Sequence, residues 1–142
     1  MNYDYRQTPL SRSLFGGLLA GLVAVTLNTI FDFVYRGTSG FALSEVVNIP
    51  SIIFASLIVA MIGGVVYFLL RNVSSKQIIY IVLFMALTIL GIFWAVGIQR
   101  TPNAIQQHDF RILFGGVVLI TGLCTAFLVP YFARHDGIYN EI

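Results

Sequence analysis

Four long apolar runs constrain this chain more than any other feature of its sequence. They cover residues 14–35, 52–70, 78–98 and 112–132. Each run is close to the ~20 residues that an α-helix needs to cross the ~30 Å hydrocarbon core of a bilayer. We therefore expect one all-α membrane domain over residues 1–142, a four-transmembrane-helix bundle with short loops.

The composition indicates that lipid rather than water surrounds this domain. Of its 142 residues, 58% are hydrophobic and only 10% are charged, and the mean hydropathy is +0.88. A soluble domain carries ~25% charged residues. The formal net charge of +2 is far too small for a nucleic-acid-binding protein. We expect contact with the lipid bilayer and none with nucleic acid, and the short connections leave no room for a soluble catalytic domain.

The basic residues of the predicted loops bear on orientation. One side of the predicted bundle carries Arg6, Arg12, Arg71, Lys76 and Arg134. The other side carries Arg36, Arg100 and Arg111. Because Lys and Arg are in excess in cytoplasmic loops, this distribution predicts that the N and C termini are both cytoplasmic.

Local signals mark the ends of the predicted helices. Pro50 suits the first turn of the second helix, where its missing N–H costs nothing. Ser74 and Gln77 have the spacing of a capping box for the third helix. Asp109 can cap the fourth. The dipeptide Thr101-Pro102 suits the start of a short surface helix in the preceding connection.

Two nearly identical hexapeptides, RSLFGG at residues 12–17 and RILFGG at residues 111–116, lie about a hundred positions apart. They lack the GxGxxG and GxxxxGK[ST] spacings of nucleotide-binding loops. An inverted repeat of four helices would pair the first helix with the third, whereas this match joins the first and the fourth. We therefore interpret both copies as a packing device, in which two glycines let another backbone approach closely.

Small residues recur at helical spacing along all four runs. The predicted packing positions are Gly17, Gly21, Ser56, Ala60, Gly64, Gly91, Gly115 and Gly122. Lipid provides no hydrophobic drive between helices, so close contact along such seams has to hold the bundle together.

Asn28, Asp32 and Arg36 are spaced by four residues and so share one face of the first helix. Ionisable residues within membrane helices are costly and usually functional. We favour an ion pair between Asp32 and Arg36 near the membrane interface, beneath which Asn28 bonds a neighbouring helix. The alternative, in which Asn28 and Asp32 form part of an ion or proton site, stays open.

Neither of the two His-Asp pairs predicts a metal site. His108-Asp109 and His135-Asp136 fall on opposite sides of the predicted bundle, and neither side offers an obvious third ligand. The predicted spans contain no histidine that could hold a haem between helices. We expect no metal and no cofactor.

Four segments resemble a family of small bacterial four-helix integral membrane proteins, a domain family of unknown function. They are AGLVAVTLN in the first run, NIPS before the second, GGVVYFLLR at its end, and LVPYFAR at the end of the fourth. The resemblance implies the four-helix layout and a bacterial cytoplasmic membrane. The family has no established activity or catalytic residues, so the resemblance implies nothing about chemistry.

These patterns favour a non-enzymatic integral membrane protein, an accessory or interaction subunit that binds other membrane proteins or further copies of itself. Its small-residue seams and its lack of converging acids, bases or metal ligands motivate this hypothesis. One alternative is a small oligomeric transporter or channel that uses Asn28 and Asp32. A membrane enzyme is favoured least, because Asp32 is the only acid that the predicted spans offer.

Overall fold

The computed structural model describes residues 8–39, 49–97 and 104–134. These residues form helices α1 (Pro9–Ser39), α2 (Ile49–Leu69), α3 (Lys76–Gly97) and α4 (Ala104–Arg134), and a short 3₁₀-helix, η1 (Leu70–Asn72), which continues α2. All four α-helices are long and apolar enough to cross a membrane. The prediction of an all-α fold with four membrane-spanning helices is confirmed.

The helices extend beyond the apolar runs from which they were predicted. Both α1 and α4 contain 31 residues. At 1.5 Å per residue each is ~46 Å long, well over the ~30 Å of hydrocarbon. Their polar ends remain helical because the backbone hydrogen bonds of a helix are made within it, whatever solvent surrounds the side chains. The ends of α1 and α4 therefore reach the level of the lipid headgroups.

Pro50 lies in the first turn of α2, as predicted. Asp109 lies more than one turn inside α4, so the prediction that it caps this helix was wrong. The side chain of Gln77 accepts a hydrogen bond from Arg134 in α4 and so joins two helices. The sequence-based interpretation missed the cap of α1, where the hydroxyl of Thr8 accepts from the backbone N–H of Ser11 at 3.2 Å. The predicted surface helix at Thr101-Pro102 lies outside the described residues.

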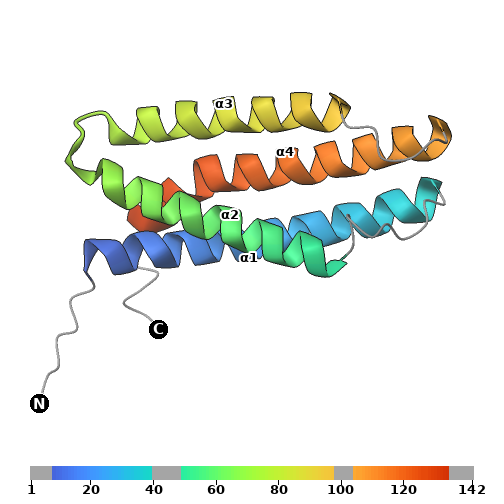
Figure 1. Ribbon diagram of the computed structural model, residues 1–142. Helices are drawn as coiled ribbons and strands as arrows, with labels where there is room; N and C mark the ends of the chain where they lie inside the picture. Colours follow the sequence, from blue (N-terminus) through green and yellow to red (C-terminus); the bar gives the residue numbers. More distant parts are fainter. Residues whose placement is uncertain (1–7, 40–48, 98–103, 135–142) are drawn as a thin grey trace, which may run out of the picture.

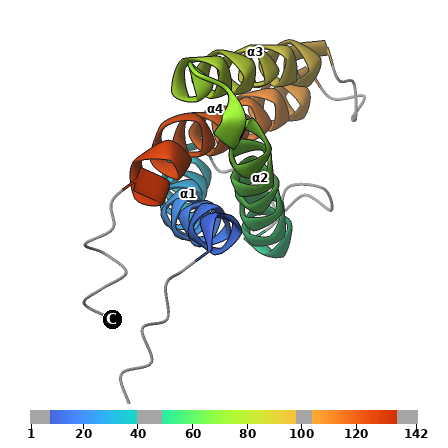
Figure 2. The same ribbon diagram turned by 90° about the vertical axis from the view of Figure 1, so that its left-hand side faces the viewer.

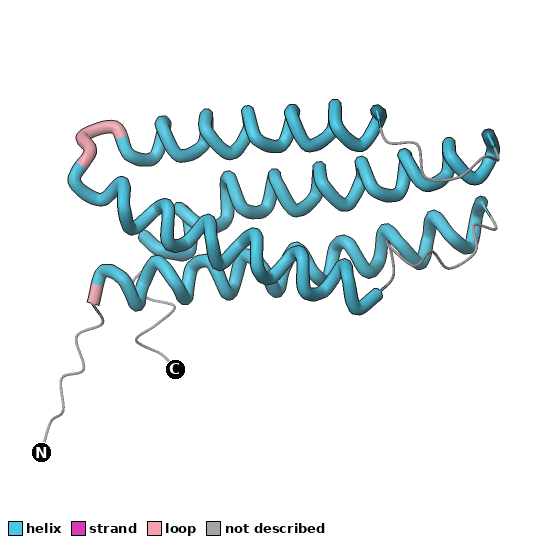
Figure 3. The backbone as a smooth tube through the Cα atoms, in the orientation of Figure 1, coloured by secondary structure: helices cyan, strands magenta, loops and turns pink. Residues whose placement is uncertain are grey.

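The four helices run roughly along one direction, with α2 crossing α1 at an angle (Figure 1). Helix α1 packs against both α2 and α4, and α3 packs mainly against α4. Seen from the end, α2 and α3 diverge from the hairpin that joins them, and α4 lies between α3 and α1 (Figure 2). The start of α1, the end of α4 and the α2–α3 turn lie at the same end of the bundle (Figure 3).

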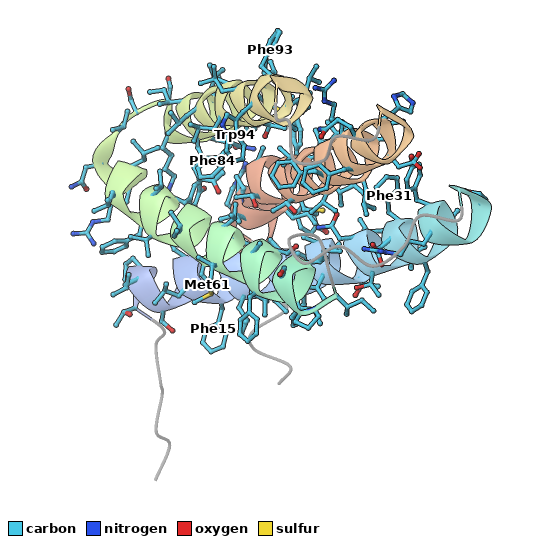
Figure 4. All side chains as sticks on the ribbon, turned by 45° about the vertical axis from the view of Figure 1, so that its right-hand side comes forward. Phe15, Phe31, Met61, Phe84, Phe93 and Trp94 are labelled. Atoms are coloured by element: carbon cyan, nitrogen blue, oxygen red, sulfur yellow. The ribbon has the colours of Figure 1, made fainter. Side chains whose placement is uncertain are left out.

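Two apolar clusters fill the bundle, one towards each end. The cluster near the α2–α3 turn includes Tyr67, Tyr80 and Phe84. The other joins Ile52 of α2 to Phe110 and Leu113 of α4. Large apolar side chains such as those of Phe15 and Phe93 point away from the bundle on opposite sides, as expected of a surface that faces lipid (Figure 4).

Several of the predicted packing positions form a seam of small residues between α1 and α2. A Cβ added at Gly17 would lie 2.6 Å from the carbonyl oxygen of Ala60, and one at Gly21 would lie 3.2 Å from the Ala60 Cβ. A Cβ at Gly64 would collide with the backbone of Ser13. Ala60 itself is fully buried. Two backbones therefore approach here as closely as glycine permits.

The seam between α3 and α4 uses fewer of the predicted positions. Gly122 packs directly against the side chain of Thr88, and a Cβ at Gly91 would lie 2.9 Å from a methyl group of Val118. Gly115 differs from the expectation, because a Cβ there would meet nothing within 4 Å. The close contact in this hexapeptide belongs to the next residue, Gly116, which packs against the Phe31 ring.

Candidate functional site

A cluster of three polar side chains joins α1, α2 and α4 in the interior of the bundle. The Nδ2 atom of Asn28 donates one hydrogen bond to Oγ of Ser56, at 2.9 Å, and another to Oγ1 of Thr121, at 2.8 Å. The two hydroxyl oxygens lie 3.4 Å apart. Asn28 and Ser56 are fully buried and Thr121 is 6% exposed. The amide thus uses both of its N–H donors to hold two other helices.

This polar cluster lies between the two apolar clusters of the bundle. Ser56 and Thr121, which accept the hydrogen bonds from Asn28, both lie at helix contacts. Ser56 was predicted only as a small residue of the α2 seam, and Thr121 was not singled out. Their distance from Asn28 in the chain, 28 and 93 residues, hides the contact from local sequence patterns. The Oδ1 atom of Asn28 is buried and has no hydrogen-bond partner within the described residues.

Asp32 and Arg36 form the ion pair that their spacing predicts. The Nε atom of Arg36 lies 2.7 Å from Oδ1 of Asp32. The Asp32 side chain is only 2% exposed, whereas that of Arg36 is 14% exposed. The carboxylate therefore lies inside the bundle, and the longer guanidinium side chain carries the opposite charge towards the end of α1.

A second polar contact ties the same end of α1 to α4. The hydroxyl of Tyr35 donates to Oδ1 of Asp109 at 2.9 Å, and the Tyr35 ring stacks on Phe31. Asp32 and Asp109 are the two carboxylates of the described residues, and each contacts a side chain of α1.

An apolar groove opens between α2 and α3 and has α4 as its floor. It encloses about 240 Å³ and is lined by Ala55, Val59, Phe84, Leu87, Thr88, Phe114, Val117, Val118, Thr121 and Gly122. Figure 4 shows Phe84 directed from α3 into the space beside α2. The groove exists because α2 and α3 meet through Tyr67, Tyr80 and Gly63 near their turn, and then diverge.

The described ranges contain no group of three or more His, Cys, Asp or Glu side chains placed to hold a metal ion. His108 is exposed near the start of α4. The pair His135-Asp136 lies outside the ranges that the structure describes.

Comparison of the chain with known protein families, curated proteins and solved structures found no match.

Proposed function

We propose that this integral membrane protein is a non-catalytic subunit whose α2–α3 groove binds a transmembrane helix of another membrane protein. The observation that carries the proposal is the groove itself, which is open and mostly apolar and lies between α2 and α3. Three further observations support it: the groove lining is apolar, α3 is poorly covered by the rest of the bundle, and Asn28 and Asp32 are already bonded within the chain.

The groove has the chemistry that packs membrane helices together. Val117, Val118, Thr121 and Gly122 of α4 form its floor, Ala55 lies on the α2 wall and Thr88 on the α3 wall. Ala55 is small and exposed, so it lets a further helix approach the α2 wall closely. A helix seated in the groove would gain van der Waals contact along its apolar lining.

Helix α3 is the least covered of the four. In its most apolar stretch 22% of the residues are buried inside the bundle, compared with 39% in α4. Its contacts lie mainly along α4, so the face towards α2 is left to the groove. A helix seated there would contact α2, α3 and α4 together.

The transporter alternative receives less support. The Asn28 amide bonds to two helices of its own chain, and Asp32 pairs with Arg36. Neither Asn28 nor Asp32 lines the groove. An ion or proton site at these residues would require the contacts that hold the bundle to open.

For orientation, we propose that both termini face the cytoplasm of a bacterial cell, as the basic residues and the family resemblance suggest. In the described residues, Arg12, Arg71, Lys76 and Arg134 gather at the end of the bundle where α1 begins and α4 ends. Arg36 and Arg111 lie towards the other end. The excess supports a cytoplasmic location for the terminal end.

The test places a photocrosslinking amino acid at Leu87, which is 50% exposed in the groove, in native membranes. Ile30 on the outer face of α1, 55% exposed, is the matched control position. We expect a discrete adduct with another membrane protein from Leu87 and none from Ile30. If the only adducts join two copies of this chain, the groove binds a second copy rather than another protein. Identical adducts from Leu87 and Ile30 would contradict the proposal.

Two tryptophan substitutions distinguish binding in the groove from a general effect of added bulk. Ala55→Trp fills the groove, while Ala86→Trp adds the same bulk to an exposed position of α3 that does not line it. We expect the Leu87 adduct to disappear in the Ala55→Trp protein and to persist in the Ala86→Trp protein. Persistence in both variants would place the partner elsewhere.

A further inference from the structure

Four basic side chains from four different elements converge on one pocket at the terminal end of the bundle. Arg12 of α1, Arg71 of η1, Lys76 of α3 and Arg134 of α4 line a hollow of about 480 Å³. They are four of the six Lys and Arg residues that the structure describes. A second hollow, which shares Tyr67, Lys76 and Arg134 with the first, adds Ser74 and Ser75 of the α2–α3 turn. Together the two hollows form what we call the basic recess.

Three cations of the basic recess, Arg71, Lys76 and Arg134, have contacts within the described residues that orient them without neutralising their charge. Arg71 lies over the Phe68 ring, 4.1 Å from its centroid, and the Nζ atom of Lys76 lies 5.3 Å from the centroid of Tyr67. Arg134 donates to the neutral amide of Gln77. The two carboxylates in the described ranges, Asp32 and Asp109, contact Arg36 and Tyr35 instead. An aromatic face or an amide orients a cation but does not neutralise it.

An independent feature of the recess also points to a ligand. Tyr67 lines both hollows and is only 4% exposed, yet its hydroxyl has no hydrogen-bond partner among the described residues. Its ring packs edge-on against Tyr80, with centroids 5.3 Å apart, and this contact holds the ring in place. A buried donor without a partner is costly and rare in folded proteins. An acceptor oxygen inside the recess would satisfy it.

The position of the recess restricts the ligand. It lies where α1 begins, α4 ends and α2 turns into α3, so it is at the level of the lipid headgroups. Phosphate is the anion of that layer, and clustered Lys and Arg beside transmembrane helices recognise it. Arg and Lys donors match several phosphate oxygens at once, and the Tyr67 hydroxyl can donate to one more.

We propose that the basic recess binds a phosphate group, held by Arg71, Lys76 and Arg134 together with the hydroxyl of Tyr67. The phosphate is carried either by the headgroup of an anionic phospholipid or by a soluble phosphate compound. The basic recess is separate from the α2–α3 groove, and the two share no lining residue. Failure of one proposal therefore leaves the other standing.

The test uses the full chain in a neutral detergent and native mass spectrometry, which counts bound lipids. Phosphatidylglycerol and phosphatidylcholine are titrated in parallel, and inorganic phosphate competes with phosphatidylglycerol in a third arm. We expect phosphatidylglycerol to bind roughly tenfold more tightly than the zwitterionic lipid. Displacement by millimolar inorganic phosphate would assign the site to soluble phosphate compounds, and resistance to it would assign the site to the lipid headgroup.

Three variants connect this binding to the recess. Arg71→Gln removes one cation and Tyr67→Phe removes only the hydroxyl, and each should weaken phosphatidylglycerol binding by about tenfold. Arg111→Gln makes the same charge change near the other end and should leave binding unchanged. If Arg71→Gln fails to give a monodisperse helical protein, Lys76→Gln replaces it. Equal binding by the Arg71→Gln and Arg111→Gln proteins, or unchanged binding by the Tyr67→Phe protein, would overturn the proposal.

Discussion

At the scale of single residues, one amide organises the interior of this bundle. Asn28 donates to Ser56 and Thr121, and so links α1 to α2 and α4. Lipid cannot replace these hydrogen bonds, but the chain inserted and unpacked in a membrane finds other partners for its polar groups. Bonds of this kind are therefore worth ~0.6 kcal/mol on average and up to ~1–2 kcal/mol.

The contribution of Asn28 can be measured directly. We expect Asn28→Ala to lower the free energy of unfolding in mixed micelles by about 1–2 kcal/mol, because it removes both hydrogen bonds. Thr26→Ala is the control, since the exposed Thr26 bonds only to the carbonyl of Leu22 in its own helix. Equal effects of the two substitutions would show that the cluster does not hold the helices together.

The Asp32–Arg36 pair makes a second prediction at this scale. The pair is partly buried, and Arg36 retains access to the end of the bundle. We expect Asp32→Asn and Arg36→Gln to destabilise the protein by less in combination than the sum of their separate effects, with a coupling energy of about 1 kcal/mol. A double-mutant cycle of unfolding free energies checks this. A coupling energy of zero would mean that the two charges do not interact, and would reopen the alternative role of Asp32 in transport.

At the scale of helices, close approach between backbones determines which pairs pack. Helix α1 meets α2 along Gly17, Gly21 and Gly64, and at Gly17 and Gly64 an added Cβ would first meet backbone atoms of the facing helix. Backbone cannot move aside as the end of a flexible side chain can. The seam is therefore intolerant of even small additions.

Two glycine-to-alanine variants test this seam. Gly17→Ala places a Cβ 2.6 Å from the Ala60 carbonyl oxygen, and we expect it to destabilise the bundle by about 1–3 kcal/mol. At Gly115 nothing lies within 4 Å, so Gly115→Ala should be neutral or stabilise by about 0.5–1 kcal/mol through the higher helix propensity of alanine. Thermal unfolding in detergent measures the stability of both proteins. Equal changes in stability for Gly17→Ala and Gly115→Ala would contradict this account.

At the scale of the whole molecule, the bundle is open on one side and polar at one end. Helices α2 and α3 diverge from their turn, which leaves the groove, while the basic recess closes the end where that turn lies. These two surfaces face different surroundings: the groove faces the interior of the membrane, and the recess faces the headgroups. We assign a protein partner to the first and a phosphate group to the second.

The four-helix arrangement also predicts accessibility. Cys124 is the single cysteine of the sequence and is first replaced by alanine. Ser74→Cys in the α2–α3 turn should then react with a membrane-impermeant maleimide only from the side where α1 begins and α4 ends, which we propose to be cytoplasmic. Gly97→Cys at the end of α3 should react only from the opposite side. Labelling of intact cells and of inverted vesicles distinguishes the two. Reaction of both cysteines from the same side would contradict four crossings.

The sequence by itself determined that lipid surrounds the chain, that the chain is helical, and that four helices can cross the membrane. Apolar runs of bilayer-crossing length have one stable conformation in hydrocarbon, because a helix satisfies its own backbone hydrogen bonds there. It also placed Asp32 beside Arg36, since a spacing of four residues on a helix is a local relation. The ends of the helices were less accurately predicted, because polar residues at the headgroup level continue a helix without an apolar signal.

Only the tertiary structure decided which helices meet and what the buried polar groups contact. Ser56 and Thr121 reach Asn28 through the rotation and axial shift of three helices, which no local pattern encodes. The same rotation turned Gly116 rather than Gly115 towards Phe31, since consecutive residues of a helix face directions about 100° apart. The groove and the basic recess arise likewise between elements, from the angle at which α2 and α3 diverge and from the end at which four cations gather.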